Sequence, residues 1–123
     1  MKKVEVLIVD DEAIIAQDLT AKVNEMGYSG FSVGSSKEAI RKISPSYEPD
    51  LILMDVTLKG DENGIQTARI IQKLRKIPIL FVTSLSRSTV LNQIKDLVRT
   101  GYIQKPFCKE ELQGCIRELL PTA

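Results

Sequence analysis

Residues 7–13 of the chain read LIVDDEA, so an apolar run ends in three consecutive acidic residues, Asp10, Asp11 and Glu12. The predicted strand spans residues 4–9, and its largely apolar, β-branched composition is typical of a strand covered on both faces of a parallel sheet. Carboxylates grouped at the end of a buried strand repel one another, which raises the pKa of at least one of them. The stretch therefore predicts a central strand whose end carries a repulsion that another group must offset.

Four further segments have the character of strands. Residues 51–54 and 79–82 are continuous apolar runs, as expected of buried central strands. Residues 31–34 alternate between apolar and polar positions, and residues 102–104 form a short run, so both are predicted to be edge strands. The chain thus contains five predicted strands.

Amphipathic helical patterns separate these strands, because apolar residues recur there at intervals of three and four. The positions are Ile15, Leu19, Val23 and Met26; Ala39, Ile40 and Ile43; Ile65, Ala68, Ile71 and Leu74; Val90, Ile94 and Leu97; and Leu112, Ile116 and Leu119. Alternating strands and helices predict an α/β fold of the (βα)5 type, a doubly wound, flavodoxin-like parallel sheet of five strands in the order 2-1-3-4-5.

Length and composition restrict the class of protein. The 123 residues fit one domain, 1–123, and 43% hydrophobic and 27% charged residues are ordinary for a globular chain. A net charge of +1 predicts no direct nucleic-acid partner, and the apolar runs are too short to predict a membrane partner. The N-terminus has no signal-peptide cleavage pattern, so we expect a cytoplasmic protein. Cys108 and Cys115 lie beyond disulfide reach on one predicted helix, and we expect both to be free thiols packed as small hydrophobes.

Polar side chains follow the strands at the point where ligands bind in open parallel sheets, which is the switch in strand order between the first and third strands. Asp10 and Asp11 end the first strand and Asp55 ends the third, while Thr83 ends the fourth and Lys105 follows the fifth. Three carboxylates in one crevice fit Mg²⁺, which takes oxygen ligands. A carboxylate beside such a cation can act as a nucleophile and form an aspartyl phosphate.

These residues resemble the receiver domain of two-component response regulators, and the resemblance covers essentially the whole chain. It includes the paired acids Asp10 and Asp11, Asp55 after another apolar strand, Thr83 followed by the small Ser84, Tyr102, and the pair Lys105 and Pro106. It implies that Asp55 accepts a phosphoryl group from a sensor histidine kinase or a histidine phosphotransfer protein.

The resemblance also implies the roles of the neighbouring residues. Asp11, Asp55 and the backbone carbonyl of Thr57 would hold Mg²⁺, and Asp10 would act partly through ordered water. Such a protein catalyses its own phosphorylation and dephosphorylation and turns over no separate substrate.

A second set of implied roles concerns signalling. Lys105 would pair with a phosphoryl oxygen, and the hydroxyl of Thr83 would move to bind another. Tyr102 would then rotate inward and change the surface made by the fourth helix, fifth strand and fifth helix, which would signal to an output domain or partner. The peptide bond between Lys105 and Pro106 is expected to be cis.

Other interpretations of the same residues stay open. Acidic residues after a strand can cap the next helix, which is our interpretation of Glu12, and Tyr102 could be simple edge-strand packing. The loop DVTLKGDENG at 55–64 has no proline, where many relatives carry one, and Thr57 and Leu85 occupy the positions that tune phosphoryl lifetime in the family.

Three rival functions would use parts of the same pattern. A haloacid-dehalogenase-like phosphatase would need a second Asp where Thr57 stands. A flavodoxin-like cofactor binder would need a phosphate-binding first loop, whereas this loop is acidic, and no GxGxxG or Walker loop is present. The third is a receiver-like interaction module that works without phosphorylation, and it remains the alternative to the phosphoacceptor.

Overall fold

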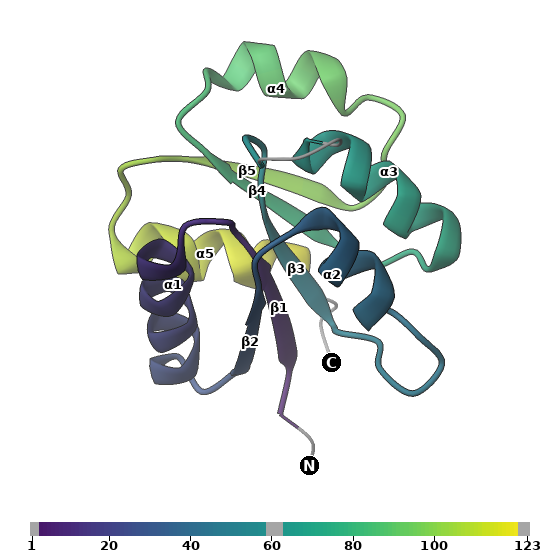
Figure 1. Ribbon diagram of the computed structural model, residues 1–123. Coiled ribbons are helices and arrows are strands. Elements are labelled where there is room, and N and C mark those ends of the chain that lie inside the picture. Colours follow the sequence, from purple (N-terminus) through teal and green to yellow (C-terminus); the bar gives the residue numbers. More distant parts are fainter. Residues whose placement is uncertain (1–2, 59–62, 121–123) are drawn as a thin grey trace.

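The computed structural model describes residues 3–58 and 63–120, which form a five-stranded parallel sheet with helices on both faces (Figure 1). The strands are β1 (Glu5–Val9), β2 (Ser29–Val33), β3 (Leu51–Asp55), β4 (Ile79–Thr83) and β5 (Thr100–Gln104). Their order is β2-β1-β3-β4-β5, and each neighbouring pair is parallel. The predicted doubly wound order is confirmed.

The described residues form five helices in two layers; the first four connect successive strands, and the fifth follows the last strand. They are α1 (Ala13–Glu25), α2 (Ser36–Lys42), α3 (Gly64–Leu74), α4 (Arg87–Gln93) and α5 (Lys109–Leu119). Helices α1 and α5 pack on one face of the sheet, and α2, α3 and α4 contribute to the apolar cluster on the other (Figure 1). None of the described helices is long and apolar enough to cross a bilayer.

The continuous apolar runs follow from this two-sided covering. In β1, Leu7 and Val9 join the cluster beneath α2, α3 and α4, whereas Val6 and Ile8 join the cluster beneath α1 and α5. Successive side chains of a strand point to opposite faces, so every position must be apolar when both faces are covered. Strand β2 lies at the edge of the sheet, as predicted, but it spans Ser29–Val33 and not 31–34. Its exposure alternates, and the apolar Phe31 is exposed.

Local signals in the sequence explain several element ends. Ser35 caps α2 by accepting a hydrogen bond from the N–H of Glu38, and Asn63 forms a reciprocal capping box with Gln66 at the start of α3. After α1, Gly27 has a φ of +95°, which glycine adopts without a steric penalty. Glu12 occupies the N-cap position of α1, but its side chain makes no capping hydrogen bond, so only its position matches our interpretation.

The fourth helix is shorter than its apolar spacing indicated. It ends at Gln93, whereas the predicted pattern continued to Leu97. The carbonyl of Gln93 accepts a hydrogen bond from Arg69, and the carbonyl of Ile94 accepts one from Leu97. A turn therefore keeps Ile94 and Leu97 against the core without a further helical turn.

The prediction for the cysteines was half wrong. Both thiols are free, and Cys115 is half-buried against the apolar cluster beneath α1 and α5. Cys108 is exposed, because it is the N-cap residue of α5, and its Sγ and its backbone N–H both contact Glu111 Oε1 at 3.3 Å.

Candidate functional site

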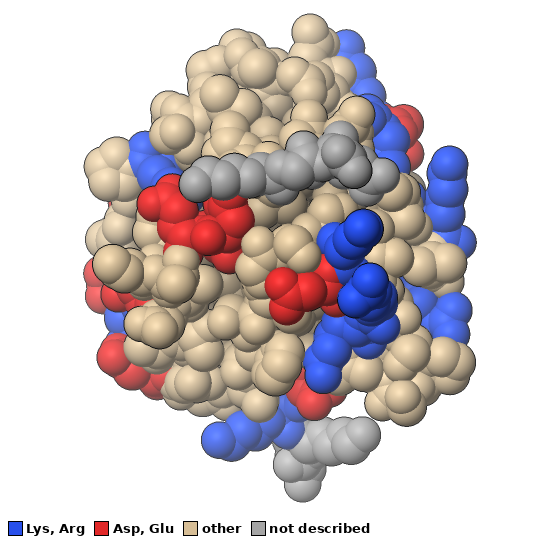
Figure 2. Space-filling view, in the orientation of Figure 1, with Lys and Arg blue, Asp and Glu red and all other residues tan. Residues whose placement is uncertain are grey.

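The carboxyl ends of β1 and β3 lie side by side and bring three acidic residues together. Val9 pairs with Met54 in the sheet, so the residues that follow, Asp10 and Asp55, are neighbours. One carboxylate oxygen from each of Asp10, Asp11 and Asp55 lies within 4.8 Å of the others. Figure 2 shows acidic side chains gathered where β1 ends and α1 begins. The strand-end prediction therefore places these three residues correctly.

Asp10 is the most buried of the three, with 2% of its surface exposed. Its Oδ1 accepts a hydrogen bond from the N–H of Glu12 at 2.9 Å, whereas its buried Oδ2 accepts none from any residue that the structure describes. Burial raises the pKa of Asp10, and the charges of Asp55 and Asp11 add to the rise, against the opposing effects of the Glu12 N–H and Lys105. A cation beside Oδ2 would stabilise the ionised carboxylate.

Asp55 is also buried, and its two oxygens have different surroundings. Oδ1 accepts hydrogen bonds from the backbone N–H and from the hydroxyl of Thr57, at 3.1 and 3.2 Å. Oδ2 instead lies 4.0 Å from Nζ of Lys105. Thr57 thus fixes the carboxylate and leaves the other oxygen directed toward the lysine.

Lys105 is the cation that the structure places beside this cluster. Its Nζ lies 3.7 Å from Oδ2 of Asp10 and 4.0 Å from Oδ2 of Asp55. The backbone N–H of Lys105 donates to the carbonyl of Thr83, and its peptide bond to Pro106 is cis, as expected. Among the residues that the structure describes, this one positive charge faces the carboxylates of Asp10, Asp11 and Asp55, so the described part of the site keeps an excess of negative charge.

Thr83 and Tyr102 meet at the backbone of Leu85. The buried Thr83 hydroxyl accepts a hydrogen bond from the N–H of Leu85 at 3.1 Å. The hydroxyl of Tyr102 donates to the carbonyl of Leu85 at 2.6 Å, and the half-buried ring packs against the core. A single residue on the loop after β4 therefore connects the two side chains.

Sequence reasoning missed two contributions to the site. It assigned only the backbone carbonyl of Thr57, whereas the N–H and hydroxyl of Thr57 hold Asp55; a Thr two residues after an Asp is the spacing of such a turn. It also gave no role to Gly64, although a Cβ there would lie 2.0 Å from the carbonyl oxygen of Asp55. Of the loop at 55–64, residues 59–62 lie outside the described residues.

The donor set and its charge suit two chemical tasks. Three clustered carboxylates, one with an oxygen that is buried and accepts no hydrogen bond from the described residues, fit a divalent cation with a preference for oxygen. A fixed carboxylate with one oxygen directed toward a lysine fits a nucleophile whose product carries extra negative charge.

Comparisons with known sequences show which family the chain is similar to. A family model described as the response regulator receiver domain matches residues 6–117. The transcriptional regulatory protein PdtaR of Mycobacterium tuberculosis is 33% identical over 108 residues, which cover 87% of this chain and 52% of PdtaR. The uncharacterized transcriptional regulatory protein YrkP of Bacillus subtilis is 33% identical over 111 residues, covering 89% of this chain and 46% of YrkP. The chain spans about half the length of the curated relatives it matches.

Solved structures with the same fold are also similar in sequence. The response regulator protein TrrA of Thermotoga maritima, solved in complex with Mg²⁺-BeF, is 28% identical with a TM-score of 0.83, over 98% of this chain and all of that one. The N-terminal domain of a response regulator/sensory box/GGDEF protein of Carboxydothermus hydrogenoformans is 29% identical with a TM-score of 0.85, over 94% of this chain and 92% of that one.

Proposed function

The chain belongs to the response regulator receiver domain family, and on this premise we propose that Asp55 accepts a phosphoryl group from a phosphohistidine of a sensor kinase or histidine phosphotransfer protein. One observation carries the proposal. Asp55 is buried with Oδ1 held by Thr57 and with Oδ2 directed toward Lys105, at the carboxyl end of a central strand.

The proposed transfer is an in-line displacement. Oδ2 of Asp55 forms a bond to phosphorus while the bond from phosphorus to the donor imidazole nitrogen breaks, and that nitrogen regains the electron pair. Thr57 keeps the carboxylate in one orientation, which reduces the entropy lost on the way to the transition state. Lys105 would then pair with a phosphoryl oxygen, since its Nζ already lies 4.0 Å from Oδ2.

The acidic cluster would hold Mg²⁺. Asp11, Asp55 and the backbone carbonyl of Thr57 would be its ligands, with Asp10 acting partly through water. When bound, Mg²⁺ neutralises negative charge on the phosphoryl oxygens and on the carboxylates. Two observations support this assignment, which are the buried Oδ2 of Asp10 in this chain and the complex of the relative TrrA with Mg²⁺-BeF.

Signalling is proposed to run through Thr83 and Tyr102 to the surface of α4, β5 and α5. The hydroxyl of Thr83 now accepts a hydrogen bond from the N–H of Leu85. It would move away from that N–H to donate a hydrogen bond to a phosphoryl oxygen. Tyr102 is already half-buried with its hydroxyl on the carbonyl of Leu85, so phosphorylation would shift the population of this arrangement. An output domain or a separate protein would read that surface.

The wider setting is proposed on the same premise. Residues 1–123 would act as one cytoplasmic receiver domain that catalyses its own phosphorylation and dephosphorylation. Its partners would be a kinase or phosphotransfer protein and an output, without direct contact to nucleic acid or membrane.

Intact-protein mass spectrometry tests the proposal. Incubation with acetyl phosphate and Mg²⁺ is expected to add one phosphoryl group, labile in alkali, and Asp55→Asn is expected to abolish the adduct. Asp18→Asn, at an exposed acid paired with Lys22 on α1, is the matched control and should be phosphorylated normally. Absence of an adduct on the unaltered protein would favour the interaction module, and an undiminished adduct on Asp55→Asn would assign another acceptor.

A further inference from the structure

A pocket lies between α3 and the connection from α4 to β5, and none of the residues that line it belongs to the acidic cluster. Its volume is about 130 Å³, and it is lined by Arg69, Gln72, Lys73, Lys76, Asp96 and Leu97. Three cationic side chains and one carboxylate give it a formal charge of +2. The volume is several times the roughly 30 Å³ of one water molecule in the liquid, so the head of an acidic side chain fits.

The floor and one wall of this pocket are held rigidly. Gln72 is 4% exposed, and its amide donates to the carbonyls of Ile77 and Val98 while it accepts from the N–H of Val98. The guanidinium of Arg69 contacts both carboxylate oxygens of Asp96 and donates to the carbonyl of Gln93. These fixed groups lose little further conformational entropy when a ligand binds beside them.

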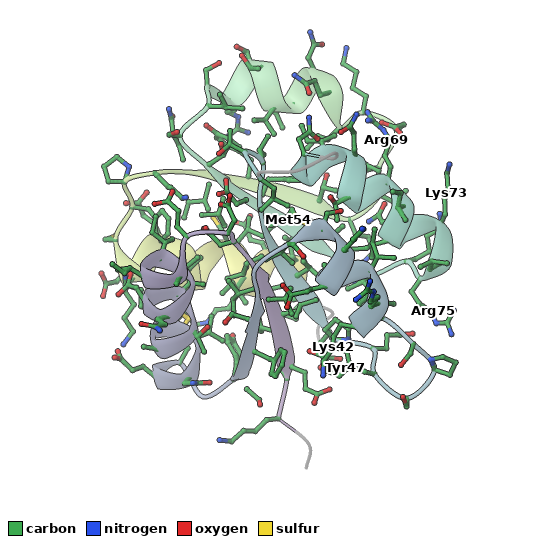
Figure 3. The ribbon with its side chains drawn as sticks, in the orientation of Figure 1. Lys42, Tyr47, Met54, Arg69, Lys73 and Arg75 are labelled. Carbon is green, nitrogen blue, oxygen red and sulfur yellow. The ribbon has the colours of Figure 1, made fainter. Side chains whose placement is uncertain are left out.

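Two lysines supply the charge that is not neutralised. Lys73 and Lys76 are exposed, and within residues 3–58 and 63–120 neither makes an ion pair or hydrogen bond. In Figure 3, Lys73 projects outward from α3, whereas Arg69 is directed toward the end of α4. Because the guanidinium of Arg69 is already paired with Asp96, Lys73 and Lys76 are the lining cations that can bind an incoming anion.

The basic surface extends from the pocket onto α2. Lys37 and Arg41 lie one turn apart on that helix and form no ion pair within the described part of the chain. A buried hydrogen bond of 2.7 Å between Thr67 and Ser36 ties α3 to α2. Figure 2 shows Lys and Arg side chains gathered over both helices. The basic surface is therefore longer than a single acidic side chain of a ligand would occupy.

We infer that the pocket between α3 and residues 94–98, with the adjoining basic side of α2, is a docking site for an acidic segment of a partner protein. One carboxylate of the segment enters the pocket between Lys73 and Lys76, and later acidic residues meet the cations of α2. Asp55 does not line this pocket, so the docking proposal does not rest on the phosphorylation of Asp55.

Charge pattern favours a protein segment over a nucleic acid. The carboxylates of Glu38, Glu48 and Asp96 lie among the basic residues of this surface. A duplex phosphate backbone carries one charge about every 1.7 Å and would meet these carboxylates along with the cations. An acidic peptide has fewer charges at wider spacing and can avoid them.

Fluorescence anisotropy with a labelled peptide of alternating Glu and Gly tests the inference, with its Gln-containing counterpart as the uncharged probe. The double variant Lys73→Gln/Lys76→Gln is expected to weaken binding of the Glu peptide about tenfold. The matched control, Lys3→Gln/Arg117→Gln, removes the same charge from exposed sites elsewhere and should change the dissociation constant less than about twofold. Equal losses in both variants, or no binding by the unaltered protein, would overturn the docking site.

A second measurement locates the peptide. In nitrogen-15 NMR spectra, the Glu peptide should shift the side-chain amide of Gln72, which lines the pocket, and the backbone N–H of Val98, which donates to that amide. Shifts confined to other surfaces would refute the placement. Tighter binding of single-stranded oligothymidine than of the Glu peptide at equal salt, lost in the same lysine variant, would identify a nucleic-acid site instead.

Discussion

Asp10 and Asp55 lie close together at a place where both side chains are buried. The sheet requires this proximity. Val9 and Met54 are paired in neighbouring strands, and Asp10 and Asp55 are the residues that directly follow them. Lys105 lies about equally far from one oxygen of each, at 3.7 and 4.0 Å, so it offsets part of the repulsion. The remaining repulsion and desolvation destabilise only the folded state, because water solvates both carboxylates in the unfolded chain.

Replacing Asp10 should therefore stabilise the metal-free protein. Asp10→Asn keeps the size of the side chain and removes a buried negative charge next to Asp55 and Asp11. In buffer with EDTA we expect the free energy of unfolding to rise by about 1 kcal/mol, as measured by urea denaturation. The control Asp18→Asn alters an exposed ion pair and should change it by less than about 0.5 kcal/mol.

A lower stability of Asp10→Asn in EDTA would contradict this account. It would mean that the attraction between Asp10 and Lys105, with its Nζ at 3.7 Å, outweighs the burial of the carboxylate and its repulsion by Asp55.

Asp96 shows the opposite behaviour, because its hydrogen bonds with Arg69 hold the pKa of its carboxyl below the usual value. A carboxyl group with a lowered pKa in the folded state stabilises the protein above its unfolded pKa, and this contribution is lost as pH falls through the folded pKa. We expect Asp96→Asn to lower the urea midpoint at pH 7 and to have less effect with each step toward pH 3. A difference that grows toward acid would refute the assignment.

Helix α3 begins directly against the strand that carries Asp55. The N–H of Gly64 donates to the carbonyl of Val56 at 2.8 Å, and a Cβ at Gly64 would lie 2.0 Å from the carbonyl oxygen of Asp55 and 2.9 Å from Cα of Val56. These neighbours are backbone atoms and cannot rotate away. The glycine thus allows the close approach that sets the position of Asp55.

Gly64→Ala should accordingly displace the end of β3. We expect a loss of about 1–3 kcal/mol in unfolding free energy and slower phosphorylation of Asp55, measured by urea denaturation and by mass spectrometry with acetyl phosphate. Gly114→Ala is the matched control within α5, where an added Cβ meets nothing within 4 Å. That change should stabilise the protein by about 0.5–1 kcal/mol. Equal effects of the two substitutions would show that the approach at Gly64 is unimportant.

The elements were predictable wherever burial dictated the residue types. Strands β1, β3 and β4 are covered on both faces, so their apolar runs predicted them closely, and their ends placed Asp10, Asp55 and Thr83. The end of α4 was not predictable from its own segment, because the carbonyl of Gln93 is satisfied by Arg69 from another helix. The connection of Thr83 to Tyr102 was missed for a similar reason, since it runs through backbone atoms of Leu85, which carry no signal in the sequence.

At the scale of the whole molecule, the sheet order determines where chemistry can occur. The order β2-β1-β3-β4-β5 places β1 next to β3. The connection after β1 leads to β2 on one side of this pair, and the connection after β3 leads to β4 on the other side. In the part of the chain that the structure describes, no crossover therefore passes over the carboxyl ends of β1 and β3, and the acidic residues gather in the crevice that is left there. The two apolar clusters lie on the faces of the sheet and hold it in place.

Cation binding should for this reason be measurable as stability of the whole fold. If Mg²⁺ binds the acidic cluster of the folded chain and not the unfolded chain, a concentration ten times its dissociation constant adds about 1.4 kcal/mol to the unfolding free energy. We expect thermal unfolding followed by circular dichroism to show a midpoint that rises with Mg²⁺ and returns to its initial value with EDTA. Asp11→Asn removes a proposed ligand and should reduce this rise, whereas Asp18→Asn should preserve it. A midpoint that ignores Mg²⁺, or an equal rise in Asp11→Asn, would show that the three carboxylates do not form the magnesium site.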